Sequence, residues 1–496
     1  MKKLFLFSAI GLSITGLLTY LSYPSQQNEI PVIHWVTDAN PVRKEQIKKF
    51  HEWQVANGHT SKPGKPKVEL KLDTANRDIS KMIIQGVSGV GSDIMDLRSG
   101  SGVRYFESMG LLKDLSEDAK QHGYGLDRTF KSIGPELGVP NEEGFKQYAY
   151  PCNVSTDLFW LNKAVFSKYK IPMPTNSWTW KDYENLGIQL RDASKAAGDP
   201  KVYIGARPDL LTLIRNYGMS IFNETGTECR LNDPQYVNIL KKIQYWTEDI
   251  KIIPNKADMA SFDVQSSFGG VKLALFKSGQ FATFTIGRWG LIGFRKGAAM
   301  DLSVIYPPHE VIKTSTIRTR CAGIYAGSKN PELAQLFLRY LASETYNDTI
   351  IDFADALPPN PNFMEKDSYK KPPQFSNEWG CHEVFSNAAK EIAVAPSHSP
   401  FVSQEVAMRL INKWQAKYEV GICSAEEAAK QTQIEINNEI QRTLKEIPAF
   451  TNLYNTRKQN QESIDQSRQA GKKVSARLVN NPYFLFHGRK TGWIED

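Results

Sequence analysis

The chain has 496 residues, of which 41% are hydrophobic and 11% aromatic. It is too long for one average domain and too rich in apolar residues for a disordered chain, so two lobes with appendages fit it best. The net charge is +8, but the segment 455–490 alone holds eight basic residues against Glu462 and Asp465. The rest of the chain is nearly balanced, which argues against a nucleic-acid-binding protein.

At the N-terminus, Lys2 and Lys3 precede the apolar run Leu4–Leu21. A charged start followed by an apolar stretch is typical of an export signal, and eighteen helical residues would reach about 27 Å, close to the thickness of a bilayer core. No A-x-A cleavage site is evident, so residues 1–27 are expected to be a signal peptide or an uncleaved inner-membrane anchor. The remainder is expected to be exported, to the periplasm or another extracytoplasmic space.

Strand and helix patterns alternate over the first hundred residues. A short apolar run at Pro31–Thr37 predicts a buried strand, alternation of apolar and polar side chains at Lys67–Asp73 predicts a strand with one buried face, and helical patterns lie between the strands. Such a βαβ order predicts a parallel sheet whose ligands gather at the carboxyl ends of the strands, here residues 37–40 and 97–100. The predicted strands are Pro31–Thr37, Lys67–Asp73 and Ser92–Leu97, and the predicted helices are Pro41–Ala56 and Asn76–Val87.

The stretch "NSWTWKDYENLGIQL" places Trp178 and Trp180 on either side of Thr179. Thr179 and Asp182 have the spacing of a capping box, and Trp178 and Tyr183 have that of a hydrophobic staple. We therefore predict a helix beginning here with both tryptophans packed inward. The alternative is a flat platform for a ring-shaped ligand.

Further helices are predicted to begin at Asp233-Pro234, at Asn330-Pro331 and, with a capping serine, at Ser424. The tail from Thr451 is polar and basic, and we expect it to be loosely ordered. It is either a solvated mobile extension or a segment attracted to anionic lipid headgroups. Strands are predicted at Gln280–Ile286, Leu302–Tyr306 and Cys321–Ala326.

Sequence motifs for catalysis are missing: there is no H-E-x-x-H, G-x-x-x-x-G-K-[ST] or G-x-S-x-G, and the histidines lack metal-ligand spacing. No metal or other cofactor is therefore expected. The odd number of cysteines, five, would allow one or two disulfides, or the cysteines are small buried residues. The two carboxylates that hydrolyse a sugar are recognised by their separation in the folded protein and not by their spacing in the sequence. A secreted polysaccharide-active enzyme is therefore the alternative to a binding protein.

Four stretches carry a resemblance to a known family. They are the "G-L-L-x-D-L" run within Gly91–Glu117, the crossover strand and "P-x-T-W" helix start within Tyr148–Tyr183, "FKSGQFATFTIGRWG" and "CAGIYAGSKNPELAQLFLRYLAS". In this order they resemble the family 1 extracellular solute-binding proteins, the maltodextrin-binding group of ABC importers. The resemblance covers about Ile30–Leu444, and the tail after Ile447 lies outside it.

The resemblance implies an α/β, two-lobed periplasmic-binding-protein fold (type II) with a hinge near Tyr148–Asn153 and Arg318–Gly323. It implies lobe one at 28–148 plus 280–318 and lobe two at 149–279 plus 319–446. Residues 447–496 would form a basic C-terminal extension. The resemblance also implies that the protein is the substrate-binding component of an ABC importer, which passes a carbohydrate to permease subunits. It is expected to be a monomer, not to be an enzyme and not to bind nucleic acid.

The strand ends and the resemblance together select candidate ligand-binding residues. Trp289 follows a strand and a glycine, and is expected to stack on a sugar ring. Each of the others has a structural alternative, such as a core position for Trp35, a helix cap for Asp38 or a turn for His398. The selected residues are Trp35, Asp38, Arg98, Ser99, Asn153, Ser155, Arg207, Trp289, His398 and Phe401.

Overall fold

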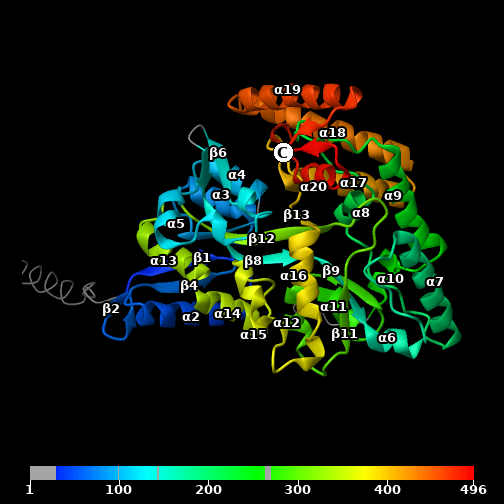
Figure 1. Cartoon of the computed structure of the whole chain (residues 1–496), viewed down its shortest axis with the longest axis horizontal. Coiled ribbons are helices and arrows are strands. Elements are labelled where there is room, and N and C mark those ends of the chain that lie inside the picture. The colour runs from blue at the N-terminus through cyan, green and yellow to red at the C-terminus, as the bar shows by residue number, and fades with distance from the viewer. Residues whose placement is uncertain (1–29, 99, 142–143, 263–269) are drawn as a thin grey trace, which may run out of the picture.

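A sheet runs through the middle of the protein and joins two lobes (Figure 1). The computed structural model describes residues 30–98, 100–141, 144–262 and 270–496. In this sheet β4, β1 and β5 are parallel, as the βαβ pattern predicts, and β12 is antiparallel to both β5 and β8. The order is β13-β12-β5-β1-β4 with β8 also on β12; the bounds are β1 Val32–Val36, β4 Glu69–Asp73, β5 Ile94–Arg98, β8 Ala149–Thr156, β12 Ser315–Ile324 and β13 Ala393–Val394.

The first lobe lies to the left in Figure 1 and packs helices against this sheet. Its core joins β1 and β4 to α2 and α13, with Phe50, Leu70 and Phe337 all buried. Small hairpins, β2 Thr60–Lys62 with β3 Lys65–Pro66 and β6 Gly138–Asn141 with β7 Gly144–Gln147, lie at its edges. The helices are α2 Val42–Ala56, α3 Ile79–Val87, α4 Ser101–Ser108, α5 Ser116–His122, α13 Pro331–Ala342 and α14 Glu344–Asp352.

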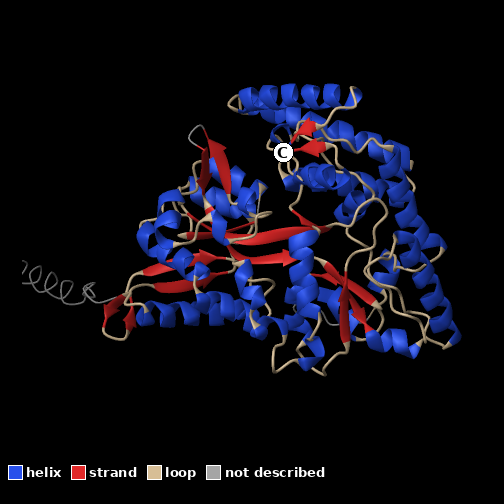
Figure 2. Ribbon diagram, viewed as in Figure 1, coloured by secondary structure: helices blue, strands red, loops and turns tan. Residues whose placement is uncertain are grey.

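The second lobe has its own sheet of order β10-β9-β11, with β9 Leu158–Asn162, β10 Thr283–Ile286 and β11 Leu302–Ile305 (Figure 2). Every residue of β9 is buried, because helices cover the sheet. These helices are α6 Lys163–Lys168, α7 Trp180–Ala196, α8 Leu210–Asn216, α9 Pro234–Gln244, the π-helix Tyr245–Asp249, α10 Lys256–Ala260, α11 Gly270–Lys277, α12 Leu291–Phe294, α16 Cys381–Glu391, α17 Gln404–Glu419 and α18 Ala425–Glu446.

Helix α7 begins as its sequence predicts. Thr179 and Asp182 form the complete capping box. Trp178 is 3% exposed and Trp180 is fully buried. Both tryptophans contact Tyr183, at ring-centroid distances of 5.9 and 5.4 Å. The packing interpretation is confirmed, and the ligand-platform alternative is wrong for these two residues.

The expected division of the chain between the lobes needs a correction. The segment 280–318 was expected in lobe one, yet β10 and β11 pair with β9 of the second lobe. The segment after 319 was expected in lobe two, yet β12 pairs with β5, and α13 packs on α2 of the first lobe. The physical reason is that β8 and β12 pair with each other along their length, so the chain changes lobe along each of them and returns to the second lobe between α14 and α16.

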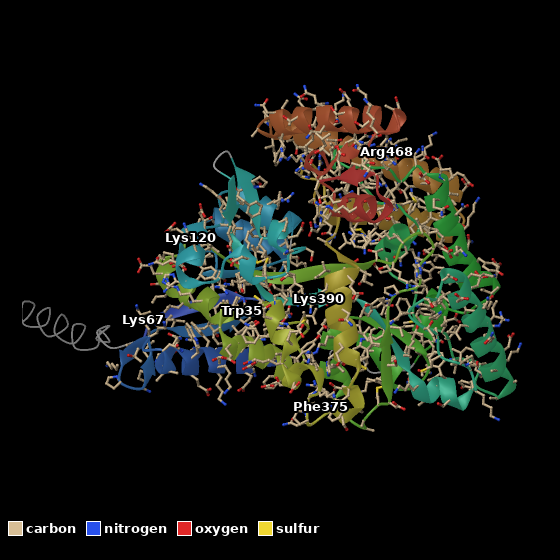
Figure 3. The ribbon with its side chains drawn as sticks, in the orientation of Figure 1. Trp35, Lys67, Lys120, Phe375, Lys390 and Arg468 are labelled. Atoms are coloured by element: carbon tan, nitrogen blue, oxygen red, sulfur yellow. The ribbon has the colours of Figure 1, made fainter. Side chains whose placement is uncertain are left out.

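Residues 447–496 form a folded unit, so the expectation of a loosely ordered tail is wrong. Helix α19 Phe450–Gln469 and helix α20 Pro482–Thr491 enclose the parallel pair β14 Val474–Ser475 and β15 Ile494–Glu495. A small core forms from Ile464, Val474, Val479 and Ile494. These apolar residues are far apart in sequence and meet only when the segment folds back on itself. Because the sequence around each of them is polar, no local pattern indicates the core. The unit lies on the second lobe, where Figure 3 labels Arg468.

The cysteines are small buried residues, as one of the two sequence interpretations held. Cys152, Cys229, Cys321 and Cys381 are buried and Cys423 is partly exposed, and all five are free thiols. Burial raises the pKa of the Cys229 thiol to about 12, which keeps it protonated and unreactive at neutral pH.

Within the described part of the chain, no helix combines the length and the apolar character that crossing a bilayer requires. The expected signal or anchor, residues 1–27, lies outside the described residues.

Candidate ligand-binding cleft

A cleft of about 600 Å³ opens beside the crossing strands, where they enter the second lobe. The end of β8, strand β10, the N-terminus of α8 and one face of α17 line it. Its residues include hydroxyl, amide, charged and aromatic side chains, the mixture typical of a site for a polar small molecule. They are Ser155, Asp157, Ala206, Arg207, Pro208, Asp209, Leu210, Thr212, Lys272, Thr283, Phe284, Thr285, Ile286, Trp289, Arg318, Met408, Asn412 and Gln415.

Arginines on β12 connect the cleft to both lobes. Arg318 and Arg320 are two residues apart on the strand and therefore share one face. Arg318 Nη1 lies 3.3 Å from Asp157 in the second lobe. Arg320 reaches the first lobe, with Nε 2.8 Å from Asp96 and Nη1 3.0 Å from Asp38. Each positive charge thus meets a carboxylate, and the strand offers hydrogen-bonding groups with little net charge.

Burial shifts the carboxylates beside these arginines. It raises the pKa of Asp96 to about 7, although the hydrogen bond from Thr37 acts in the opposite direction. Burial also raises the pKa of Asp157, which the charge of Arg318 opposes. Desolvated ionisable groups of this kind concentrate in functional clefts.

Polar atoms without partners point to a ligand. Ser155 Oγ, Arg207 Nη2 and Gln415 Nε2 line the cleft, are buried, and find no hydrogen-bond partner within the described residues. A buried polar atom left without a hydrogen bond costs about 1–3 kcal/mol. A ligand that supplies donors and acceptors to these atoms would recover that cost.

Trp289 contributes an aromatic surface, and its position depends on the glycine before it. A Cβ on Gly287 would collide with Ser155 Oγ and would lie 2.9 Å from Cδ1 of Trp289. Only a residue without a side chain therefore lets the indole approach the end of β8 so closely. The ring follows β10 in the short 3-10 helix Arg288–Gly290 and lines the cleft. An aromatic face next to convergent polar groups suits a sugar ring.

Arg207 stands between this cleft and a neighbouring cavity of about 470 Å³. Its Nη1 lies 2.5 Å from Glu419 at the end of α17, and Lys256 Nζ lies 3.4 Å from the same carboxylate. The two spaces share Ala206, Arg207 and Lys272 as lining residues. A ligand longer than one ring could therefore extend past Arg207.

The profile of the family "Bacterial extracellular solute-binding protein" matches residues 63–348, more than half of the chain. The chain belongs to this family. Such a protein is an exported binder of a solute, which agrees with the lobes and cleft described above.

Solved structures support the same two-lobed fold for this solute-binding protein. The ABC substrate-binding protein Lmo0181 from Listeria monocytogenes, in complex with cycloalternan, matches with a TM-score of 0.68 and 23% identity, over 83% of this chain and 100% of that one. The GacH receptor of Streptomyces glaucescens matches at 0.66 and 18%, over 84% and 99%. A solute-binding protein from Agrobacterium vitis with bound D-mannitol matches at 0.63 and 17%, over 83% and 99%.

Three of the predicted site residues line the cleft of this solute-binding protein. Ser155, Arg207 and Trp289 line it directly. Asp38 follows β1 and accepts hydrogen bonds from Arg43 and Arg320.

Arg98 ends β5 opposite Arg320 and is exposed. Ser99 lies outside the described residues.

Other predicted residues have structural roles. Trp35, labelled in Figure 3, lies in the first lobe and is fully buried. Its ring centroid is 4.8 Å from that of Phe337. Phe401 is also fully buried, and it contacts Tyr454 of α19 edge-on. Asn153 donates to the buried carboxylate of Asp355. We leave these residues out of the candidate site, because they bind other parts of the protein.

His398 likewise contacts a protein group, Glu136 of the first lobe.

Sequence reasoning missed the residues of β12 and α17, among them Arg318, Arg320, Asn412 and Gln415. A signal for the arginines existed: in "STIRTRCAGI" they alternate with Ile317, Thr319 and Cys321, as on a strand with one polar face. The α17 residues gave no such signal, because their approach to β10 depends on the tertiary fold.

Arg288, next to Trp289, is fully buried and faces away from the cleft. It donates to the backbone oxygens of Ile351 and Ala356 at 3.1 and 2.9 Å, and its Nε donates to Nδ1 of His382 at 3.0 Å. Burial lowers the pKa of Arg288 to about 10. The side chain thus anchors the turn that carries Trp289.

His382 gives this anchor a dependence on pH. Burial, followed by the positive charge of Arg288, lowers the pKa of His382 from its ordinary value near 6.5 to about 4. Between these values the unfolded chain binds a proton that the folded protein does not, so stability falls as the pH falls from 6.5 towards 4. We expect the stability advantage of the wild type over His382→Gln in urea unfolding to shrink by about 2–3 kcal/mol between pH 7.5 and 4.5. A constant difference across this range would contradict the assignment.

Proposed function

We propose that this solute-binding protein is the substrate-binding component of an ABC importer, and that it captures a neutral sugar or oligosaccharide in the cleft beside Trp289. The observation that carries the proposal is the group of unpartnered polar atoms, Ser155 Oγ, Arg207 Nη2 and Gln415 Nε2, around the same cleft as an indole face. Sugars present both an apolar ring face and many hydroxyl groups, so they match this combination.

The charge arrangement favours a neutral ligand. Arg318 and Arg320 are already paired with Asp157 and with Asp38 and Asp96. A hydroxyl group can donate to such a carboxylate and accept from such an arginine without upsetting the balance. A strongly charged ligand would leave one partner of a pair uncompensated.

The similar structures with cycloalternan and D-mannitol bound show that this fold holds neutral polyhydroxylated ligands of very different size. The adjoining cavity beyond Arg207 supports the larger class for this protein. The proposed partner is a membrane permease, which would recognise the closed form, and the proposed working form is an exported monomer without enzymatic activity.

Closure is the proposed mechanism. A ligand that contacts both lobes binds the closed form more tightly than the open form, and this difference alone shifts the population. The first lobe would contribute through Asp38 and Arg98, and the second through the cleft. No covalent bond in the ligand changes, and release follows reopening.

The test is a thermal-shift screen of the exported protein with neutral monosaccharides, polyols and oligosaccharides. A ligand present at a hundred times its Kd should stabilise the fold by about 2.7 kcal/mol, seen as a higher Tm. Its radius of gyration in X-ray scattering should decrease at the same time, and chromatography should recover the ligand unchanged. Release of shorter saccharides would instead support a polysaccharide-active enzyme, and the absence of any shift would reject sugar binding.

A further inference from the structure

A contact between the lobes lies away from the ligand cleft. Glu136 ends the 3-10 helix Gly134–Glu136 of the first lobe, and His398 lies between β13 and α17 of the second lobe. His398 Nε2 is 3.4 Å from Glu136 Oε2, which makes an ion pair when the imidazole is protonated, and the side chains are only 7% and 4% exposed. Neither atom has a hydrogen bond within the described residues, so the ion pair is the interaction that satisfies them. Two polar groups from different lobes are therefore withdrawn from water only while the lobes stay together.

The turn after β5 leaves space for this contact. Gly100 has a φ of +76°, and its N–H donates to the carbonyl of Glu136 at 3.1 Å. A Cβ at Gly100 would overlap Glu136 Oε2 and lie 2.5 Å from the His398 ring. Glycine is thus required both by the backbone angle and by the approach of the second lobe.

The C-terminal extension holds the segment that carries His398. Ser397 Oγ donates to Oδ1 of Asn481 at 2.7 Å, and Asn481 Nδ2 donates to Ser220 Oγ at 2.9 Å and to the carbonyl of Phe222 at 3.0 Å. Asn481 is 1% exposed. One buried side chain of the extension therefore links the His398 segment to the body of the second lobe.

A second link runs through Arg215 of α8. Tyr483 Oη donates to the carbonyl of Arg215 at 2.8 Å, and the Arg215 guanidinium donates to the carbonyls of Val394 and Ala395 at 3.0 and 2.6 Å. Tyr483 and Arg215 are both buried. The backbone leading to His398 is thereby fixed from the side on which the extension packs.

We propose that Glu136 and His398 form a latch that holds the lobes together in the absence of ligand, and that Asn481 and Tyr483 of the C-terminal extension are its positioning residues. The inference deepens the proposed function, on which it rests, because it identifies what sets the balance between open and closed forms. A larger closed fraction before binding raises the apparent affinity in proportion. The extension would thus tune affinity without contacting the ligand.

The test uses the full chain without any ligand, so its outcome does not depend on which sugar binds. X-ray scattering would give the closed fraction of the wild type and of Glu136→Gln, His398→Gln and Gly100→Ala. We expect the closing equilibrium constant to fall by about tenfold in the first two, equivalent to about 1.4 kcal/mol. Gly100→Ala should open the lobes at least as far, because its methyl group occupies the space of the contact.

The matched control is His34→Gln, since His34 lies 3.9 Å from Asp93 entirely within the first lobe. This variant should scatter like the wild type. Unchanged scattering in all three latch variants, with unchanged circular dichroism, would overturn the latch. It would leave the proposed function standing, because sugar binding is measured separately by the thermal shift.

The role of the extension is tested by Ser397→Ala and Asn481→Ala, with the exposed neighbour Asn480→Ala as the control. Both test variants should lower the closed fraction, and neither should lower it further when combined with Glu136→Gln. Additive effects in the double variants would show that Asn481 affects closure independently of the latch, which would overturn its role as a positioning residue. Ser397→Ala keeps this test decisive if Asn481→Ala fails to fold, because it removes a single hydrogen bond at a partly exposed site.

Discussion

Replacing Asp355 by asparagine is expected to lower the free energy of unfolding by about 3–5 kcal/mol, the range for breaking a buried ion pair. Asp355 is 1% exposed and accepts hydrogen bonds from Arg43, Gln46, Asn40 and Asn153. An amide at this position would remove the negative charge opposite Arg43. Its NH2 group would also face the donor groups of the surrounding side chains.

The surroundings of Asp355 explain why relaxation cannot absorb the change. The flanking residues Ala354 and Ala356 have φ values of +54° and +69°, in the left-handed region that residues with a side chain rarely adopt. Burial lowers the pKa of Arg43, but the charges of Asp355 and Asp38 outweigh it, so the guanidinium stays charged. Asp355→Asn therefore leaves a buried cation short of its main partner.

Urea unfolding followed by circular dichroism would measure this loss. The control is Asp348→Asn, whose partially exposed carboxylate pairs with Lys366 at 2.8 Å and should contribute less than about 1 kcal/mol. Equal losses in the two variants would show that the Asp355 network is not a stabilising centre.

Replacing Trp289 by alanine is expected to weaken binding of the best saccharide from the thermal-shift screen by about 30-fold, or roughly 2 kcal/mol, as for a central aromatic contact. The indole lines the cleft and is held close to Ser155 by the absence of a side chain at Gly287. Its removal takes away the apolar face but leaves the hydrogen-bonding groups, so weak binding should persist. Trp289→Phe should retain most of the affinity.

Isothermal titration calorimetry would measure these affinities. Trp379→Ala is the matched control, since Trp379 is 48% exposed and donates to the carbonyl of Pro372 away from the cleft residues. If Trp289→Ala binds as tightly as Trp379→Ala, stacking on Trp289 does not contribute to recognition.

Local rules predicted much of the fold, because many elements begin with residues whose chemistry acts over a few positions. Asp233-Pro234 and Ser424 begin α9 and α18 as expected, and the strand pattern at Lys67–Asp73 gives β4. In each case the cap or the alternation is complete within one segment.

The division of the lobes was not predictable in this way. Strands β10 and β11 would satisfy the alternation rule in either lobe, and only their pairing with β9 decides. The folded C-terminal unit was not predicted for a related reason. Ile464 and Ile494 belong to one core although thirty residues of mostly polar sequence separate them.

The site was predicted in part. The strand ends and the family resemblance together selected Trp289, which follows β10, and Ser155, near the end of β8, but they also selected Trp35, which is buried in the core. A residue on a buried strand can point to either side of the sheet, and one residue of register decides which. Gln415 could not be found, because nothing in the sequence of α17 indicates that this helix borders β10.

The path of the chain through β8 and β12 also bears on how the protein leaves the cell. The sheet of the first lobe contains strands from before and after the segment that forms the second-lobe sheet. Its strand β5 pairs with β12, which lies more than two hundred residues later in the sequence. Contacts this distant in sequence make folding slow, because a large loop must close before they stabilise anything. The nascent chain cannot complete even its N-terminal lobe until β12 has been synthesised, which lengthens the time in which export machinery could engage an unfolded chain.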